Sequence, residues 1–218
     1  MRKSELIALG VVIVSFVIAV NLYPDMPDQM PSHWNAAGEV DGYMPKFWGM
    51  MLMPLISLGM LLLFAAIPRM DPLRKNLDAF RGHFDAFIVI LMGFMLYIYL
   101  LTLLWSLGIG FSMIRMLVPA FAVLFFYAGV LIGKSRRNWF VGIRTPWTMS
   151  SDRVWDKTHR LGGRLFKAVG IISLLGLVFE EYAIWILVGP VIVVAAYTMA
   201  YSYFEYQKET GEKGARDG

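Results

Sequence analysis

Long runs of uncharged residues constrain this chain more than any other feature of its sequence. Residues 47–67, 86–107 and 182–204 contain no Asp, Glu, Lys or Arg over 21, 22 and 23 positions. About 20 consecutive apolar residues are enough for one α-helix to cross the hydrocarbon core of a bilayer. The whole chain is 58% hydrophobic and 17% charged, which is unusual for a soluble domain. These runs therefore predict a membrane protein that crosses the bilayer several times.

Three further apolar runs, at 6–23, 116–132 and 165–179, have the length or the surroundings of membrane spans. A signal peptide is the alternative for the first of them. That run ends without the small residues of a signal cleavage site, which favours a retained helix. The sequence therefore predicts an all-α fold, a polytopic membrane protein with six transmembrane helices.

The loops between these runs differ in charge. Seven cations and two anions lie within 133–163, and a loop this basic stays on the cytoplasmic side. We call residues 133–164 the basic island. Residues 24–46, the exterior loop, contain four prolines and more acidic than basic residues, so we expect them on the opposite side.

With six membrane crossings and the basic island inside, both the N- and C-termini lie in the cytoplasm. We therefore expect a multi-pass protein of the cell (plasma) membrane. This topology explains the net charge of +4, because the cations flank apolar spans, and direct nucleic-acid binding is not expected.

We expect three parts along the chain. Residues 1–67 form an N-terminal domain with two transmembrane helices and the Pro-rich exterior loop. Residues 68–208 form a four-helix membrane domain that carries the basic island. Residues 209–218 are polar and are expected to be a disordered tail.

The centre of the basic island is irregular and rich in residues that restrict the backbone. Gly142 permits a positive φ, and Pro146 keeps Thr145 out of the helical region. Arg144 can then present its planar donors to a carboxylate, a lipid phosphate or a helix C-terminus. The candidate binding residues of the island are Asn138, Gly142, Arg144, Thr145, Pro146, Trp147, Trp155, His159 and Arg160.

Tryptophans are common at the depth of lipid headgroups, where we expect Trp139, Trp147 and Trp155 of the island.

The exterior loop has two possible roles. It is either a binding surface or a turn-rich cap whose aromatic residues rest at the headgroups. The candidate binding residues there are Pro31, His33, Trp34, Asn35, Gly38, Asp41 and Lys46.

The polar residues form no recognisable catalytic or metal-binding pattern. No Ser, His and Asp order, metalloprotease motif or glycine-rich phosphate loop appears, and cysteines are absent. His159 and Asp156 are spaced for one helix face, but two ligands are too few for a metal site, so an ion pair is favoured. We therefore expect a protein that is not an enzyme and that binds no metal or cofactor.

Two other functions stay open. A small-solute or lipid transporter needs a polar cavity at mid-membrane, for which the available residues are Ser57, Thr102, Ser173 and Thr198. An enzyme that acts on lipid headgroups would use residues at the cytoplasmic interface, namely His159, Asp156 and Arg144.

The basic island resembles the signature of the SdpI family. The resemblance lies in NWFVGIRTPWTMS at 138–150, followed by Val154-Trp155 and by THRLGG at 158–163. The exterior loop is similar to the short uncharacterised domain that commonly precedes this signature. Members of the family are integral membrane immunity proteins against a secreted toxic peptide, the sporulation-delaying factor.

The resemblance implies immunity or resistance to a secreted membrane-active peptide. It also implies two partners: the toxic peptide outside and a soluble transcriptional repressor held at the membrane inside. Both roles are expectations from the family. The charge of the basic island leaves membrane lipid, through its anionic headgroups, as the alternative partner of that loop.

Overall fold

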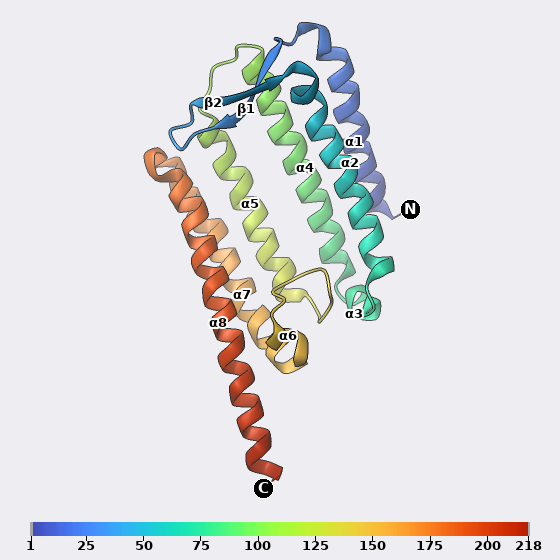
Figure 1. The fold of residues 1–218 in the computed structure, drawn as a ribbon, viewed down its shortest axis with the longest axis vertical. Coiled ribbons are helices and arrows are strands. Elements are labelled where there is room, and N and C mark those ends of the chain that lie inside the picture. The colour runs from blue at the N-terminus through green and yellow to red at the C-terminus, as the bar shows by residue number, and fades with distance from the viewer. Residues whose placement is uncertain (1, 218) are drawn as a thin grey trace.

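Six long helices of the described chain lie side by side, and the polar connections lie at the two ends of the bundle (Figure 1). The structure is a computed structural model that describes the backbone of residues 2–217 and the side chains of residues 2–211. In chain order its elements are α1 (Lys3–Leu22), η1 (Tyr23–Asp25), β1 (Gln29–Trp34), β2 (Val40–Pro45), α2 (Lys46–Met70), α3 (Arg74–Asp78), α4 (Arg81–Ser106), α5 (Met113–Lys134), α6 (Pro146–Ser150), α7 (Asp152–Ser173), η2 (Leu174–Leu177), η3 (Glu180–Tyr182) and α8 (Ala183–Asp217).

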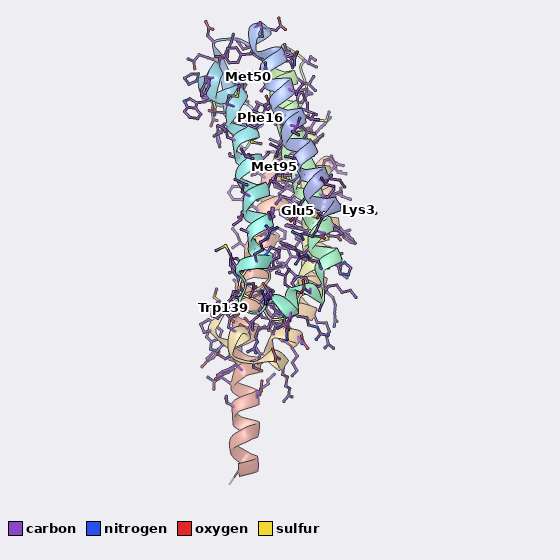
Figure 2. All side chains as sticks on the ribbon, turned by 90° about the vertical axis from the view of Figure 1, so that its right-hand side faces the viewer. Lys3, Glu5, Phe16, Met50, Met95 and Trp139 are labelled. Carbon is purple, nitrogen blue, oxygen red and sulfur yellow. The ribbon has the colours of Figure 1, made fainter. Side chains whose placement is uncertain are left out.

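The two polar loops that stand out in the sequence lie at opposite ends of the bundle. The β1–β2 hairpin and the α7–α8 turn are at one end, and α3, α6 and the basic island are at the other (Figure 1). Figure 2 shows the same separation, with Met50 near the hairpin end and Trp139 at the island end. At the hairpin end, Ser112 donates a hydrogen bond to the Glu180 carboxylate, so the α4–α5 connection and the α7–α8 turn meet.

Five helices of the described chain are long and apolar enough to cross a membrane: α1 with η1, α2, α4, α5 and α8. α7 differs because its first half is charged and only its second half is apolar. The fifth expected span, 165–179, is the second half of α7 continued by η2. The structure therefore supports a nearly all-α membrane architecture, whereas the sixth crossing and the cytoplasmic termini stay predictions.

The prediction of an all-α fold is wrong in the exterior loop, because this loop forms an antiparallel hairpin of β1 and β2. Met30 of β1 packs against Gly49 of α2, where a Cβ would lie 2.7 Å from the Met30 side chain. Prolines exclude a long helix but are tolerated in a strand that lies at a sheet edge. The hairpin covers a core cluster made of Ala19, Met26, Met30, Met50, Tyr99 and Leu103.

Glycines allow α5 and α7 to approach closely. Gly129 and Gly133 are four residues apart on one face of α5, and both lie against Gly163 of α7. A Cβ on Gly163 would lie 2.7 Å from the Gly129 carbonyl oxygen and 2.7 Å from the Gly133 Cα. Small residues in this spacing are typical of close helix packing in membranes. They fix α7 to the bundle even though its first half is polar.

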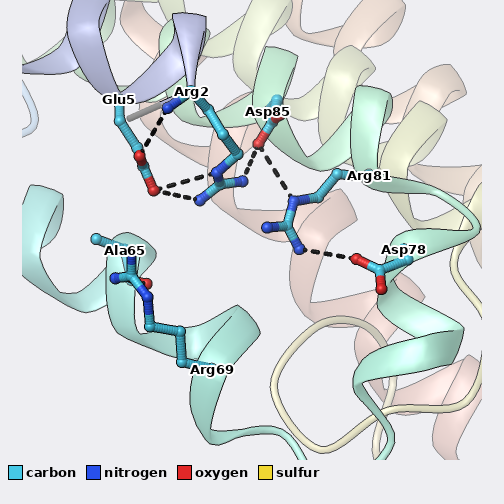
Figure 3. Close-up of polar contacts among 7 residues, drawn as sticks. All are labelled: Arg2, Glu5, Ala65, Arg69, Asp78, Arg81 and Asp85. Atoms are coloured by element: carbon cyan, nitrogen blue, oxygen red, sulfur yellow. Dashed lines mark hydrogen bonds and ion pairs between the residues drawn. The ribbon is translucent and has the colours of Figure 1, made fainter.

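An ion-pair network joins the start of α1 to the start of α4 (Figure 3). Arg2 pairs with Glu5 at 2.8 Å and with Asp85 of α4. Arg81 lies 3.9 Å from Asp85 and 3.2 Å from Asp78. The Arg2 and Asp85 side chains are each 24% exposed, so water screens this pair less than it screens a surface pair. The network therefore helps to set how α1 packs on α4.

The largest core cluster crosses the domain boundary expected at 67/68. It joins buried residues of α1, α2 and α4 to Leu131 of α5, with Phe140 and Val141 of the basic island at its edge. The division into 1–67 and 68–208 stays a prediction. Residues 209–217 of the tail that is expected to be disordered continue α8 as a helix. Gly218 lies outside the described residues.

Candidate functional site

Asn138 fixes the turn at the centre of the basic island. Its side chain is fully buried, and its amide donates to the carbonyl oxygens of Arg136 at 2.8 Å and Val141 at 2.9 Å. Its Oδ1 accepts from the backbone N–H groups of Phe140 at 2.9 Å and Val141 at 2.6 Å. These bonds use the two donors and two acceptor positions of the amide. Asn138 therefore holds the loop in shape and offers no free polar group to a ligand.

His159 of α7 holds the next part of the loop. Its Nε2 accepts from the Ile143 N–H at 2.9 Å, and its Nδ1 donates to the Trp155 carbonyl oxygen at 2.8 Å. The imidazole also stacks on the Trp155 ring, with 3.8 Å between ring centroids. Burial lowers the pKa of His159 from 6.5 to about 4, against a smaller raising effect of the Trp155 hydrogen bond. The neutral ring is therefore the stable form at pH 7.

Gly142 makes room for this imidazole. Its φ is +114°, and a Cβ there would lie 2.4 Å from Nε2 of His159 and 3.3 Å from Cζ2 of Trp155. The Trp155 indole donates to the Ser135 carbonyl oxygen at 3.1 Å, and this bond attaches the stacked Trp155 and His159 rings to the end of α5. Trp155 is 0% exposed, so its side chain cannot contact lipid headgroups, whereas Trp139 is 53% exposed.

Thr145 and Pro146 begin the short helix α6. Thr145 is the N-cap residue, and its Oγ1 also lies 3.0 Å from Oγ of Ser202 on α8. Pro146 occupies the first turn of α6, where its missing N–H has no cost. Trp147 packs edge-on against Tyr203 with ring centroids 5.1 Å apart. Thr145 and Trp147 therefore dock α6 on α8, and Pro146 begins the helix.

Arg144 and Arg160 are the exposed cations among the candidates. Arg144 Nη1 donates to the Trp139 carbonyl oxygen, and no carboxylate in the described part of the chain lies within ion-pair distance of it. Asp156 lies 3.6 Å from Arg136, so the expected ion pair of Asp156 with His159 is wrong. Arg160 lines a polar cavity of about 270 Å³ next to these groups.

The basic island is held against the α2–α3 connection by two residues that sequence reasoning missed. Asp71 is 2% exposed, and its Oδ2 accepts from the Trp139 N–H at 3.1 Å. Asn76 of α3 donates to the Arg137 carbonyl oxygen at 2.8 Å. These pairs are 68 and 61 positions apart in the chain, and no local pattern in a single sequence signals them.

A groove of about 480 Å³ lies next to the basic island. Apolar side chains from α2, α4, α5, α7 and α8 line it, among them Phe64, Phe84, Phe166 and Met199. Island residues 140–145 line one part of it, and Arg144 is the charged residue among its lining groups. The groove therefore combines an apolar interior with one cation.

In the exterior loop, Asn35 and Gly38 build the hairpin turn. Asn35 Oδ1 accepts from the N–H groups of Ala37 at 2.9 Å and Glu39 at 3.0 Å. Gly38 has a φ of +80°, which a residue with a side chain adopts rarely, and its N–H donates to the Asn35 carbonyl oxygen at 2.9 Å. These two candidates thus have a structural role in the turn.

Some of the remaining exterior candidates pack against other parts of the protein, and the others are exposed to solvent. Pro31 is buried in β1, and the Trp34 ring meets Trp105 of α4 edge-on with centroids 6.3 Å apart. The Lys46 ammonium lies 5.3 Å from the Tyr23 ring centroid. His33 and Asp41 are the exposed pair, with 2.5 Å between Nδ1 of His33 and Oδ1 of Asp41 and side chains that are 69% and 45% exposed.

The residues assigned to each of the two other functions do not all line one cavity; Asp156 and His159 share the 270 Å³ cavity, but Arg144 does not line it. Of the four transporter candidates, Thr198 lines the 480 Å³ groove, whereas Ser57, Thr102 and Ser173 are not among its lining residues. The hydroxyls of Thr102, Ser173 and Thr198 donate to carbonyl oxygens four residues earlier on their own helices. For the headgroup enzyme, both nitrogens of His159 are occupied by backbone groups.

Comparison with known proteins agrees with both sequence resemblances. Residues 134–202 match the SdpI/YfhL protein family, and residues 10–58 match a domain of unknown function, DUF1648. The chain is also 23% identical over 212 residues to the Immunity protein SdpI of Bacillus subtilis (strain 168), across 97% of this chain and 100% of that protein. No solved structure matches. The resemblance to the SdpI family, with its preceding domain, and the assignment as a multi-pass cell-membrane protein are therefore confirmed.

Proposed function

We propose that this chain, with an SdpI/YfhL region at 134–202 and a DUF1648 domain before it, protects its cell against a secreted membrane-active peptide. The observation that carries the proposal is the match to a protein named an immunity protein across 97% of this chain and 100% of that protein. The match includes both the hairpin and the basic island. It therefore supports a function that uses the whole bundle.

The arrangement of the two ends supports this role. A peptide that arrives from outside meets the hairpin, whose exposed groups include the hydrogen-bonded side chains of His33 and Asp41, and Tyr43. The hairpin rests directly on α2 and α4, so a peptide bound there can bias how these helices pack. Such a bias requires the peptide to bind one packing more tightly than another.

Signalling is a finer part of the proposal. The island end presents Arg144 and Arg160 as exposed cations, and an acidic face of a soluble transcriptional repressor would complement them. A change in helix packing would then alter how these cations are presented. A pull-down of the repressor with wild-type protein and with the Arg144→Gln, Arg160→Gln double variant tests this part separately from immunity.

Protection is tested in cells that are sensitive to the sporulation-delaying toxic peptide. Cells that express the full chain should survive toxin exposure that kills cells with an empty vector. Replacement of His33 and Asp41 by Ala should reduce survival while membrane insertion is unchanged, because both side chains are exposed. Survival equal to the empty vector, with insertion verified, would contradict the proposal.

We also propose that the chain crosses the membrane six times, with both termini in the cytoplasm. Two observations support a crossing by α7: it packs against both α5 and α8, and the turn that follows it meets Ser112 at the hairpin end. In a six-crossing arrangement the apolar part of α7 and η2 spans the outer half of the bilayer, and its charged part lies toward the cytoplasm.

Single cysteines test the topology cleanly, because the chain contains no cysteine of its own. Cysteines placed at the exposed residues Ala36, Ser150 and Glu181 report the hairpin, the island and the α7–α8 turn. With six crossings, a membrane-impermeant thiol reagent added to intact cells labels Ala36→Cys and Glu181→Cys but not Ser150→Cys. Labelling of Ala36→Cys without Glu181→Cys would instead indicate five crossings.

The small-solute or lipid transporter stays the alternative function. It would be favoured if purified protein in liposomes moved a solute or a labelled lipid across the bilayer without any toxin present.

A further inference from the structure

We propose that the groove next to the basic island binds one acyl chain of an anionic phospholipid, and that Arg144 holds the lipid phosphate. The inference concerns a lipid site and does not depend on the identity of any toxin.

The interior of the groove suits a hydrocarbon chain. Its volume is about 480 Å³, and its walls are apolar side chains of α2, α4, α5, α7 and α8. Ala128 of α5 and Ala195 of α8 are small residues in these walls, which leaves space that larger side chains would fill. An apolar cavity of this size between helices is a usual form of ligand site.

Arg144 supplies the polar end of the site. It lines the groove and also an adjoining cavity of about 520 Å³, together with Trp139, Thr145 and Met149. One guanidinium nitrogen donates to the Trp139 carbonyl oxygen, so this bond orients the group and leaves other donors open. A guanidinium binds two oxygens of one phosphate with its parallel donors, which gives a stronger contact than a neutral donor.

Charge complementarity favours an anionic headgroup over a zwitterionic one. No Asp or Glu is among the lining residues of either cavity, and Arg144 has no carboxylate partner in the described chain. A headgroup with its own ammonium would place a second cation near Arg144 without a carboxylate to receive it. A phosphatidylglycerol headgroup carries the phosphate charge alone.

The depth of the site also fits a lipid. Its lining residues Phe64 and Ile67 lie near the end of α2, and Phe84 and Phe87 lie near the start of α4. These positions correspond to the boundary between acyl chains and headgroups if the bundle crosses the bilayer. Trp139, which is 53% exposed and lines the adjoining cavity, is a residue type common at that boundary.

Lipid retention by the purified full-length protein tests the proposal. The protein is exchanged into detergent micelles with equal amounts of phosphatidylglycerol and phosphatidylcholine of identical acyl chains, and bound lipid is counted by native mass spectrometry. We expect about one retained phosphatidylglycerol and a preference for it of about tenfold, the size of one charge-assisted hydrogen-bonded contact. Arg144→Gln should reduce the preference to about one.

Two further variants separate the two parts of the site. Ala195→Phe fills the groove and should reduce retention of both lipids, with Ala128→Leu as a second variant that narrows it from α5. Arg160→Gln is the matched control, because Arg160 is an exposed cation of the same island that does not line the groove. It should keep the preference of the wild type.

The proposal is overturned if Arg144→Gln keeps the wild-type preference, if both lipids are retained equally, or if no lipid is retained. Retention of a co-purified peptide or of a second copy of the chain in place of lipid would also overturn it. Inorganic phosphate should not displace the lipid, because it cannot occupy the groove. The measurement uses no toxin, so it can fail while protection of cells holds, and the reverse.

Discussion

The backbone N–H of Ile143 donates a 2.9 Å hydrogen bond to Nε2 of His159, 16 positions further along the chain. The same imidazole donates through Nδ1 to Trp155 and lies where a side chain at Gly142 would collide with it. The centre of the basic island is therefore attached to α7 through one buried, neutral ring. His159 supports the shape of the loop from which Arg144 projects.

Protonation of His159 should destabilise the protein below neutral pH. Burial lowers its pKa from 6.5 to about 4, so the unfolded chain binds the proton first as the pH falls. The stabilisation is complete above pH 6.5 and is lost between pH 6.5 and pH 4. We expect a loss of about 2 kcal/mol between pH 7.5 and pH 5, measured by denaturant unfolding in detergent.

His159→Gln serves as the control for this effect, because an amide can accept from Ile143 and does not titrate. Its stability should change much less over the same pH interval. An equal change in both proteins would assign the pH dependence to other groups.

Gly163→Ala should separate α5 from α7. The added Cβ would lie 2.7 Å from backbone atoms of Gly129 and Gly133, and backbone cannot move aside as a flexible side chain can. We expect a loss of about 1–3 kcal/mol, read from the midpoint of thermal unfolding in detergent. Gly59→Ala on α2 is the matched control, since a Cβ there meets nothing within 4 Å. It should be neutral or slightly stabilising, and equal losses in both variants would argue against close packing.

Asn138→Leu should disrupt the basic island more than Asn138→Asp. The Leu variant removes all four hydrogen bonds and leaves two backbone N–H groups and two carbonyl oxygens unpaired. The Asp variant keeps an acceptor for Phe140 and Val141. We expect the Leu variant to lose about 3 kcal/mol or more and to become sensitive to protease within the island. Similar protection of both variants would show that the amide is not what holds the turn.

Asp85→Asn should weaken the packing of α1 on α4. It removes the charge that Arg2 and Arg81 share, in a pair whose two side chains are each 24% exposed. We expect a cost of about 1 kcal/mol that shrinks at high salt, and a double-mutant cycle with Arg2→Gln should recover most of it as coupling. Asp78→Asn is the control, because that side chain is 67% exposed at the edge of the network. A coupling energy near zero would assign α1 packing to apolar contacts alone.

Sequence reasoning succeeded where a property depends on one segment. The uncharged runs predict both ends of α2 and α4 to within five residues, and the start of α8, because an apolar segment of bilayer length has one stable backbone structure in lipid. α8 continues well past the end of its run, to Asp217. The positive φ at Gly142 and the extended backbone at Thr145 also follow from local residue types, whereas the short helix α6 that Thr145 caps was not predicted. The same reasoning underestimated α7, whose charged first half hides a helix that is continuous to Ser173.

The sequence by itself determined that the chain is a membrane protein with a basic loop at one end and a proline-rich loop at the other. Only the tertiary structure decided that the proline-rich loop pairs into a hairpin, that His159 accepts from Ile143 and that Asp71 holds Trp139. Hydrophobic length and backbone restriction act within one segment, so they can be read from one segment. Hydrogen bonds and packing between distant segments depend on which groups the fold brings within about 3 Å, and that distance exists only after the helices have packed.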